Sequence, residues 1–138
     1  MYRNIVVAYD GSDGARAALK SAIALADSSG GAVHLIHSTG HLEYAQKGVV
    51  EEDSSAESSA KNLLEEAAEQ VEEVEVVTSV VHGNPIDGIT GAAEALHADL
   101  IISGSRGRAL MPEAVLGRVT SGIVSKAPCD VLVVQPQP

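Results

Sequence analysis

The sequence predicts one doubly wound α/β domain over residues 1–138, with a five-stranded parallel sheet and helices on both faces. Three observations support this fold class. Five short apolar runs alternate with four longer segments of helical periodicity, an order typical of consecutive β-α-β units. The chain has ordinary domain length, and 45% of its residues are hydrophobic, which is enough for an aliphatic core. Clusters of glycine, serine and aspartate separate the segments, and no linker divides the chain.

The strands are predicted from continuous apolar runs, because strands buried on both faces of a parallel sheet lack the alternation of half-exposed ones. Each run is short and bounded by turn-forming residues. The predicted strands are Ile5–Tyr9, Ala32–His37, Val74–Val81, Leu100–Ser103 and Val131–Val134.

The helices are predicted from apolar residues at helical spacing. A first helix follows Ser12 or Asp13, either of which can cap it, and ends at the cluster 28–31. The other helices are predicted at Ala56–Val71, Ile86–Leu96 and Gly117–Ser125. Residues 38–55 are polar and acidic without a clear period, so we expect a long loop, a feature typical of functional segments.

Charge and composition argue against nucleic acids and membranes as partners. A net charge of -10 repels phosphate backbones, and the chain has no Phe or Trp for stacking on bases. The charge is uneven, since eleven of the 19 acidic residues lie within 43–75, whereas 106–126 has four basic residues and only Glu113. No apolar run reaches the roughly 20 residues of a membrane helix, and no signal peptide is recognised, so we expect a cytoplasmic protein.

Two segments lie where ligands bind in open α/β sheets, beyond the carboxyl ends of the strands. Residues 8–12 span the end of the first strand, and Gly104 and Gly107 follow the fourth. Glycine lets backbone N–H groups approach an anion, and Gly117 adds the free N–H groups and the dipole of a helix start. The alternative is that these glycines only form tight turns. Three side chains add positive charge nearby, Arg106, Arg108 and Arg118.

Asp10, at the end of the first strand, has two alternative roles. It can cap the following helix, or it can contact a ribose hydroxyl or a magnesium ion held by phosphates. The other reactive side chains have ordinary explanations. The five histidines lack metal-ligand spacing, the serines have no evident base partner, and Cys129 is expected to be a small packed residue.

Five sequence segments are each weak evidence alone, but they are informative because they occur together and in a particular order. They are Ile5–Ser12, His37, His82–Pro85, Ala98–Gly107 and Ala127–Val134. In this order they resemble the universal stress protein family over nearly the whole chain. The resemblance implies a five-stranded parallel sheet, an adenine-nucleotide site and dimerisation through the last strand.

Nucleotide-binding members of that family carry the pattern G-x2-G-x9-G followed by serine or threonine. Gly104, Gly107 and Gly117 match this spacing, but the next residue is Arg118. In the family that hydroxyl contacts phosphate. Arg118 therefore either replaces the contact or blocks it, and Thr120–Ser121 lie close enough in sequence to substitute in part.

The resemblance also implies which residues line the adenosine end of the site. Ala8 and Asp10 would lie beside the adenosine, and the backbone of Ser38 would hold the adenine edge. Together with the glycines and the predicted helix start, the expected nucleotide contacts are Ala8, Asp10, Ser38, Gly104, Gly107, Arg108, Gly117, Arg118, Val119 and Thr120.

Three functions are compatible with these residues. The first is a stress-response regulator that binds ATP or AMP, with or without magnesium. The second is a dimeric interaction protein of the same family that binds no nucleotide. The third is an enzyme such as a slow ATPase, for which the sequence supplies no clear general base. We predict the first, as a homodimer paired through Val131–Val134 and acting on an unidentified protein partner.

Overall fold

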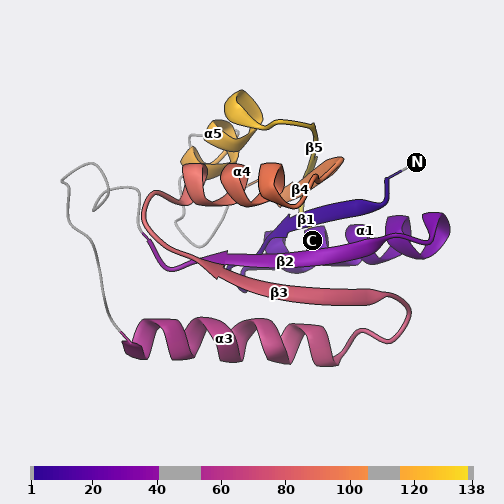
Figure 1. Cartoon of the computed structure of the whole chain (residues 1–138), viewed down its shortest axis with the longest axis horizontal. Coiled ribbons are helices and arrows are strands. Elements are labelled where there is room, and N and C mark those ends of the chain that lie inside the picture. Colours follow the sequence, from indigo (N-terminus) through magenta and orange to yellow (C-terminus); the bar gives the residue numbers. More distant parts are fainter. Residues whose placement is uncertain (1, 41–53, 106–115, 137–138) are drawn as a thin grey trace.

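The computed structural model describes residues 2–40, 54–105 and 116–136, in which strands and helices alternate (Figure 1). The strands are β1 (Asn4–Ala8), β2 (Ala32–Ser38), β3 (Glu75–Val81), β4 (Leu100–Gly104) and β5 (Asp130–Val134). The helices are α1 (Asp13–Ser29), α3 (Ser54–Glu69), α4 (Pro85–Ala95) and α5 (Arg118–Lys126). Within these ranges, no helix combines the length and apolarity needed to cross a membrane.

The strands form one parallel sheet in the order β3-β2-β1-β4-β5, which confirms the predicted fold class. The chain moves outward from the central β1 through β2 to β3, and then returns to place β4 and β5 on the other side. The strand order therefore reverses between β1 and β4. An open sheet of this kind binds ligands beside such a reversal, at the carboxyl ends of the strands. In Figure 1 the carboxyl ends of β2 and β3 lie at the left.

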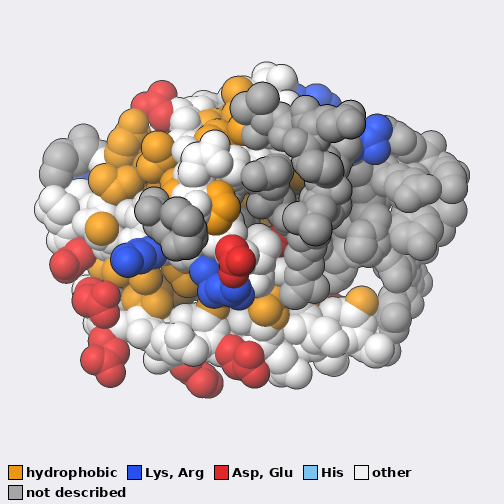
Figure 2. Space-filling model, turned by 180° about the vertical axis from the view of Figure 1, so that it is seen from behind, with side chains coloured by type: hydrophobic (Ala, Val, Ile, Leu, Met, Phe, Trp, Pro, Cys, Tyr) orange, Lys and Arg blue, Asp and Glu red, His pale blue; other side chains and the backbone are white. Residues whose placement is uncertain are grey.

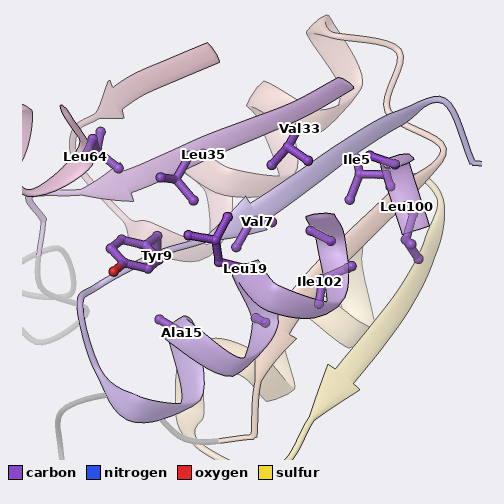
Figure 3. Packing of buried hydrophobic residues seen from close by; sticks show 13 residues of the cluster. Ile5, Val7, Tyr9, Ala15, Leu19, Val33, Leu35, Leu64, Leu100 and Ile102 are labelled. Carbon is purple, nitrogen blue, oxygen red and sulfur yellow. The ribbon is translucent and has the colours of Figure 1, made fainter. Parts of the chain in front are cut away.

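Aliphatic side chains pack on both faces of the sheet and bury the three middle residues of β1, Ile5–Val7, completely. On one face Val7 shares a cluster with Leu19 of α1 and Leu64 of α3 (Figure 3). On the other face Val6 shares a cluster with Ile123 of α5. Burying one such side chain stabilises the fold by about 1.5–3 kcal/mol. The middle of the sheet is therefore the most strongly held part of the molecule, and its strand ends are fixed points for a site.

Two predicted elements have ends that differ from the structure for a shared reason. Tyr9 was expected in the first strand, but β1 ends at Ala8, although the Tyr9 ring is buried in the core. The second helix was expected at Ala56–Val71, but α3 is Ser54–Glu69. Apolar spacing reports which side chains are buried, whereas an element ends where its backbone hydrogen bonds end. Every other predicted end that named a residue lies within one residue of the observed one.

The amino end of α1 packs directly on the carboxyl end of β4. A Cβ atom on Gly104 would lie 2.7 Å from the carbonyl carbon of Gly14 and 2.9 Å from its Cα. Real Cβ atoms do not approach backbone this closely, so Gly104 lets two main chains touch. Gly104 therefore has a packing role that is separate from any ligand.

Gly104→Ala is expected to lower the free energy of unfolding by about 1–3 kcal/mol, the usual cost of overpacking. Gly91→Ala is the matched control, because a Cβ on this exposed α4 glycine would meet nothing within 4 Å. It should raise stability by up to about 1 kcal/mol, since alanine favours a helix over glycine. Urea unfolding of the two variants measures both effects. A stabilised Gly104→Ala protein would contradict the close-contact explanation.

Candidate functional site

The candidate site lies at the carboxyl edge of the sheet, where three strands end beside the start of α5. Ala8 ends β1, Ser38 ends β2 and Gly104 ends β4. β1 pairs with both β2 and β4, so these three ends are neighbours in the sheet. The structure thus brings together residues that are far apart in the sequence.

The loop after β1 is held by short-range hydrogen bonds. The Asp10 carboxylate accepts from the Ser12 N–H at 3.0 Å. The Ser12 hydroxyl in turn accepts from the Ala15 N–H at 3.2 Å and caps α1. Arg16 donates from Nη1 to the Gly11 carbonyl at 2.5 Å, and Gly11 has a φ of 78°. Ser12, and neither Asp10 nor Asp13, is thus the cap, and Asp10 orders the loop that leads into the helix.

Ser38 directs its backbone polar groups toward the end of β1. Strand residues alternate in the direction of their N–H and C=O groups. The Ile36 carbonyl accepts from the Tyr9 N–H at 2.8 Å, on the β1 side, whereas the Thr39 N–H donates to β3. Ser38 lies two residues after Ile36, so its amide groups turn to the β1 side, at a level where β1 has already ended.

The His37 side chain forms a hydrogen bond between the ends of β1 and β2 that the sequence did not predict. Its Nδ1 lies 2.7 Å from the Tyr9 carbonyl oxygen. A carbonyl can only accept, so Nδ1 carries the proton and donates. A continued parallel ladder would pair that carbonyl with the Ser38 N–H, and the imidazole takes the same acceptor. The position of His37 at the end of an apolar run was visible in the sequence, but its partner was not.

The start of α5 is placed against β4 by buried hydroxyl groups. The Thr120 hydroxyl donates to the Gly104 carbonyl at 2.8 Å and lies 3.1 Å from the Ser103 hydroxyl. Both side chains are buried, Thr120 at 4% exposure and Ser103 at 5%. The Thr120 hydroxyl was one of two considered close enough in sequence to substitute in part for the phosphate contact. It instead points inward, because a buried hydroxyl needs a partner. Only the backbone N–H of Thr120 is left to contact a nucleotide phosphate.

The amino end of α5 has the features of an anion site. Its N-cap is Gly117, which supplies no side-chain cap. The Ser121 N–H is the first to bond within the helix, to the Gly117 carbonyl at 2.9 Å. The N–H groups of Arg118, Val119 and Thr120 precede it and have no partner inside the helix. Such groups, together with the helix dipole, favour a bound anion.

Gly117 is itself anchored, because its N–H donates to the Ser105 carbonyl at 2.8 Å. The Arg118 side chain follows at an exposed position. Gly107 and Arg108, both expected at the nucleotide, lie outside the described residues. The structure thus brings Ala8, Asp10, Ser38, Gly104, Gly117, Arg118, Val119 and Thr120 to one edge of the sheet.

Among the described residues, a group of negative charges lies on α3. The outward face of α3 carries Glu65, Glu66 and Glu69, all exposed. Figure 2 shows acidic side chains along the lower edge of the molecule, the edge at which α3 lies in Figure 1. At physiological salt the field of exposed charges decays over roughly 8 Å, so these carboxylates act mainly on their own surroundings.

The reactive side chains that the structure describes near this edge already have hydrogen-bond partners. The Ser12, Ser103 and Ser105 hydroxyls are all engaged in hydrogen bonds with backbone or with neutral side chains. In the described part of the chain, no three side chains of the metal-binding types come together. Cys129 is at the opposite end of the sheet, where burial raises the pKa of its thiol. A thiol with a raised pKa is a poor nucleophile at neutral pH.

Comparison with known proteins agrees with this geometry. A sequence profile described as the universal stress protein family matches residues 1–135. The chain belongs to the universal stress protein family. A Thermus aquaticus member, the universal stress protein in the QAH/OAS sulfhydrylase 3' region, is 32% identical over 98% of this chain and 100% of its own length.

Solved structures of the family share this fold. The universal stress protein UspA from Lactobacillus plantarum has a TM-score of 0.80 at 24% identity, covering 96% of this chain and 97% of its own. The universal stress protein from Archaeoglobus fulgidus, solved in complex with dAMP, has a TM-score of 0.75 at 26% identity. That alignment covers 96% of this chain and 97% of the Archaeoglobus protein. The family resemblance expected from the sequence is thereby confirmed.

Proposed function

We propose that this universal stress protein is a cytoplasmic stress-response regulator that binds ATP or AMP where the strand order reverses, between β1 and β4. The observation that carries the proposal is the α5 amino end, which has no side-chain cap and is held at the end of β4. A relative from Archaeoglobus fulgidus, 26% identical, was solved with the adenine nucleotide dAMP. A ligand of this kind, an adenine base with a phosphate, suits the groups at this edge of the sheet.

The phosphates would lie at the start of α5. The N–H groups of Arg118 and Val119 would donate to phosphate oxygens, and the helix dipole would add to the attraction. The Arg118 guanidinium is exposed at the first position of α5, where a positive charge is poorly matched to the helix dipole. A bound anion removes that mismatch. The cation therefore supports a phosphate at this place.

The adenosine would lie across the ends of β1 and β2. The Ser38 amide groups point to the β1 side beyond Ala8, which suits recognition of an adenine edge by backbone. Asp10 would accept from a ribose hydroxyl. If magnesium accompanies the phosphates, the Asp10 carboxylate is the oxygen ligand that this edge offers, and the ion would neutralise phosphate charge.

The first experiment is to identify what the purified protein carries and what it binds. Mass spectrometry of the denatured protein should reveal an adenine nucleotide. Titration calorimetry of the emptied protein should give tighter binding of ATP or AMP than of GTP. A protein that neither carries nor binds a nucleotide would instead support the interaction protein of the same family, since Arg118 stands where a phosphate-binding hydroxyl is expected.

Asp10→Ala should weaken the binding of adenosine and of ATP by about tenfold or more, because a hydrogen bond to a charged group contributes about 1.5–3 kcal/mol. Asp13→Ala is the matched control. It removes a carboxylate three residues away, at the exposed first position of α1, and should leave affinity unchanged. Calorimetry gives both affinities, and thermal unfolding gives the stability loss from the broken Asp10–Ser12 bond. Lower stability with unchanged affinity would assign Asp10 to the loop alone.

Arg118→Ala should weaken ATP binding more than adenosine binding, because the guanidinium can make charge-assisted bonds to the phosphates. Added salt should shrink the difference between the two ligands. Lys126→Ala is the control, since it removes a positive charge from the other end of the same helix. Calorimetry at low and high salt measures the ratio. If Arg118→Ser gains ATP affinity, the arginine blocks the site and the assignment is wrong.

We also propose a homodimer that pairs through β5. This strand is at an edge of the sheet, and Leu132 is 39% exposed. The Ser105 N–H bonds to the Val134 carbonyl, so Val134 faces β4 and the backbone of Val133 turns to the open edge. An open apolar edge strand favours pairing with a second copy.

Sedimentation at micromolar concentration should show a dimer for the wild type and a monomer for Val133→Pro, which removes an outward N–H without touching the β4 ladder. Thr78→Pro is the matched control. The Thr39 N–H bonds to the Val81 carbonyl, so Thr78 also turns outward, on the opposite edge of the sheet. It should remain dimeric. A wild type that sediments only as a monomer would rule out the β5 dimer.

A further inference from the structure

Ser105 joins three segments that meet behind the start of α5. Its side chain is completely buried. Its N–H donates to the Val134 carbonyl of β5 at 2.9 Å, and its carbonyl accepts from the Gly117 N–H at 2.8 Å. Its hydroxyl donates to Oε1 of Gln135 at 3.0 Å. One residue thus bonds to the N-cap of α5 and to the end of β5 at the same time.

The α5 start depends on such tertiary bonds because it has little local support. Gly117 provides no side-chain cap, and glycine restricts its own backbone less than any other residue. Two hydrogen bonds hold the helix start against β4. The Gly117 N–H donates to the Ser105 carbonyl, and one turn later the Thr120 hydroxyl donates to the Gly104 carbonyl. A shift of Ser105 therefore moves the N–H groups that would meet phosphate.

Among the residues joined by these hydrogen bonds, only Gln135 has a side chain that lies outside both the core and the site. It is exposed, 30 residues beyond Ser105 in the sequence. Its amide oxygen nonetheless accepts the hydrogen bond of the fully buried Ser105 hydroxyl. A buried hydroxyl that loses its partner rotates or draws in water, since leaving it unpaired is costly. Removing the Gln135 amide thus disturbs Ser105 from the β5 side.

We infer that Gln135 is a positioning residue for the phosphate end of the site, acting through the Ser105 hydroxyl on the amino end of α5. The inference rests on the proposed nucleotide site and adds a residue that the family pattern does not include. It predicts that affinity for the phosphate tail depends on the end of β5, whereas affinity for the nucleoside does not.

The test compares Ser105→Ala, Gln135→Ala and the double variant by calorimetry with ATP and with adenosine. Each single variant should weaken ATP binding by about two- to tenfold, the effect of one hydrogen bond, and change adenosine binding by less than about twofold. The double variant should be no weaker than the worse single variant, because both changes remove the same bond. Gln70→Ala, at an exposed position just after α3, is the control and should match the wild type.

A second readout follows the positioning directly. Hydrogen exchange of the Gly117 amide, whose proton bonds to the Ser105 carbonyl, should accelerate by about two- to tenfold in Gln135→Ala without a matching fall in global stability. ATP affinity that is indifferent to Gln135, or effects that multiply in the double variant, would overturn this inference and leave the nucleotide site standing. A wild type that binds no ATP would overturn the proposed function itself, and unchanged Gly117 exchange would then reject the positioning link as well.

Discussion

The backbone contact between Gly14 and Gly104 is the constraint on which the site geometry depends. Because neither residue carries a Cβ, the first turn of α1 can lie directly against the end of β4. This contact sets the distance between the loop after β1 and the loop after β4, the two segments that flank the reversal of strand order. A larger residue at Gly104 would push the two segments apart at the edge where a ligand is expected.

The glycines of the family pattern have different physical roles in this protein. Gly104 is needed for packing, since its missing side chain is replaced by the main chain of α1. Gly117 is an N-cap, and its value is that no side chain occupies the helix start. Of the two pattern glycines that the structure describes, Gly104 therefore meets a packing requirement, whereas Gly117 leaves the helix start open for the proposed phosphate. This explains why spacing alone left tight turns and anion binding as equal alternatives.

Buried polar groups fix the positions of the segments that meet at the carboxyl edge of the sheet. Ser103, Ser105 and Thr120 are all buried, and every one of their hydroxyls bonds to a group at the end of β4, α5 or β5. A hydrophobic core is tolerant of small displacements, whereas a buried hydrogen bond requires its partner at one distance and angle. The sheet therefore supplies stability, and these hydroxyls hold the helix start in one place.

Local arrangement also explains how a chain of net charge -10 can offer a place for an anion. The exposed glutamates of α3 are screened by salt, while helix dipole and N–H groups act within a single turn. His37 and Asp10 add order to the neighbouring loop by bonding to backbone groups. Any attraction of an anion to this edge would thus come from oriented backbone groups more than from the overall charge.

The sequence by itself determined the fold class, the alternation of elements and most of their ends, because burial in a parallel sheet selects continuous apolar runs such as Leu100–Ser103. It also identified the strand ends that carry Ala8, Asp10 and Ser38. Only the tertiary structure decided which hydroxyls remain available, since Thr120 turns inward to Gly104 and Ser105 bonds to Gln135. These partners lie 16 and 30 residues away in the sequence. Periodicity records whether a residue is buried, but a hydrogen bond across the fold depends on where the chain returns in space.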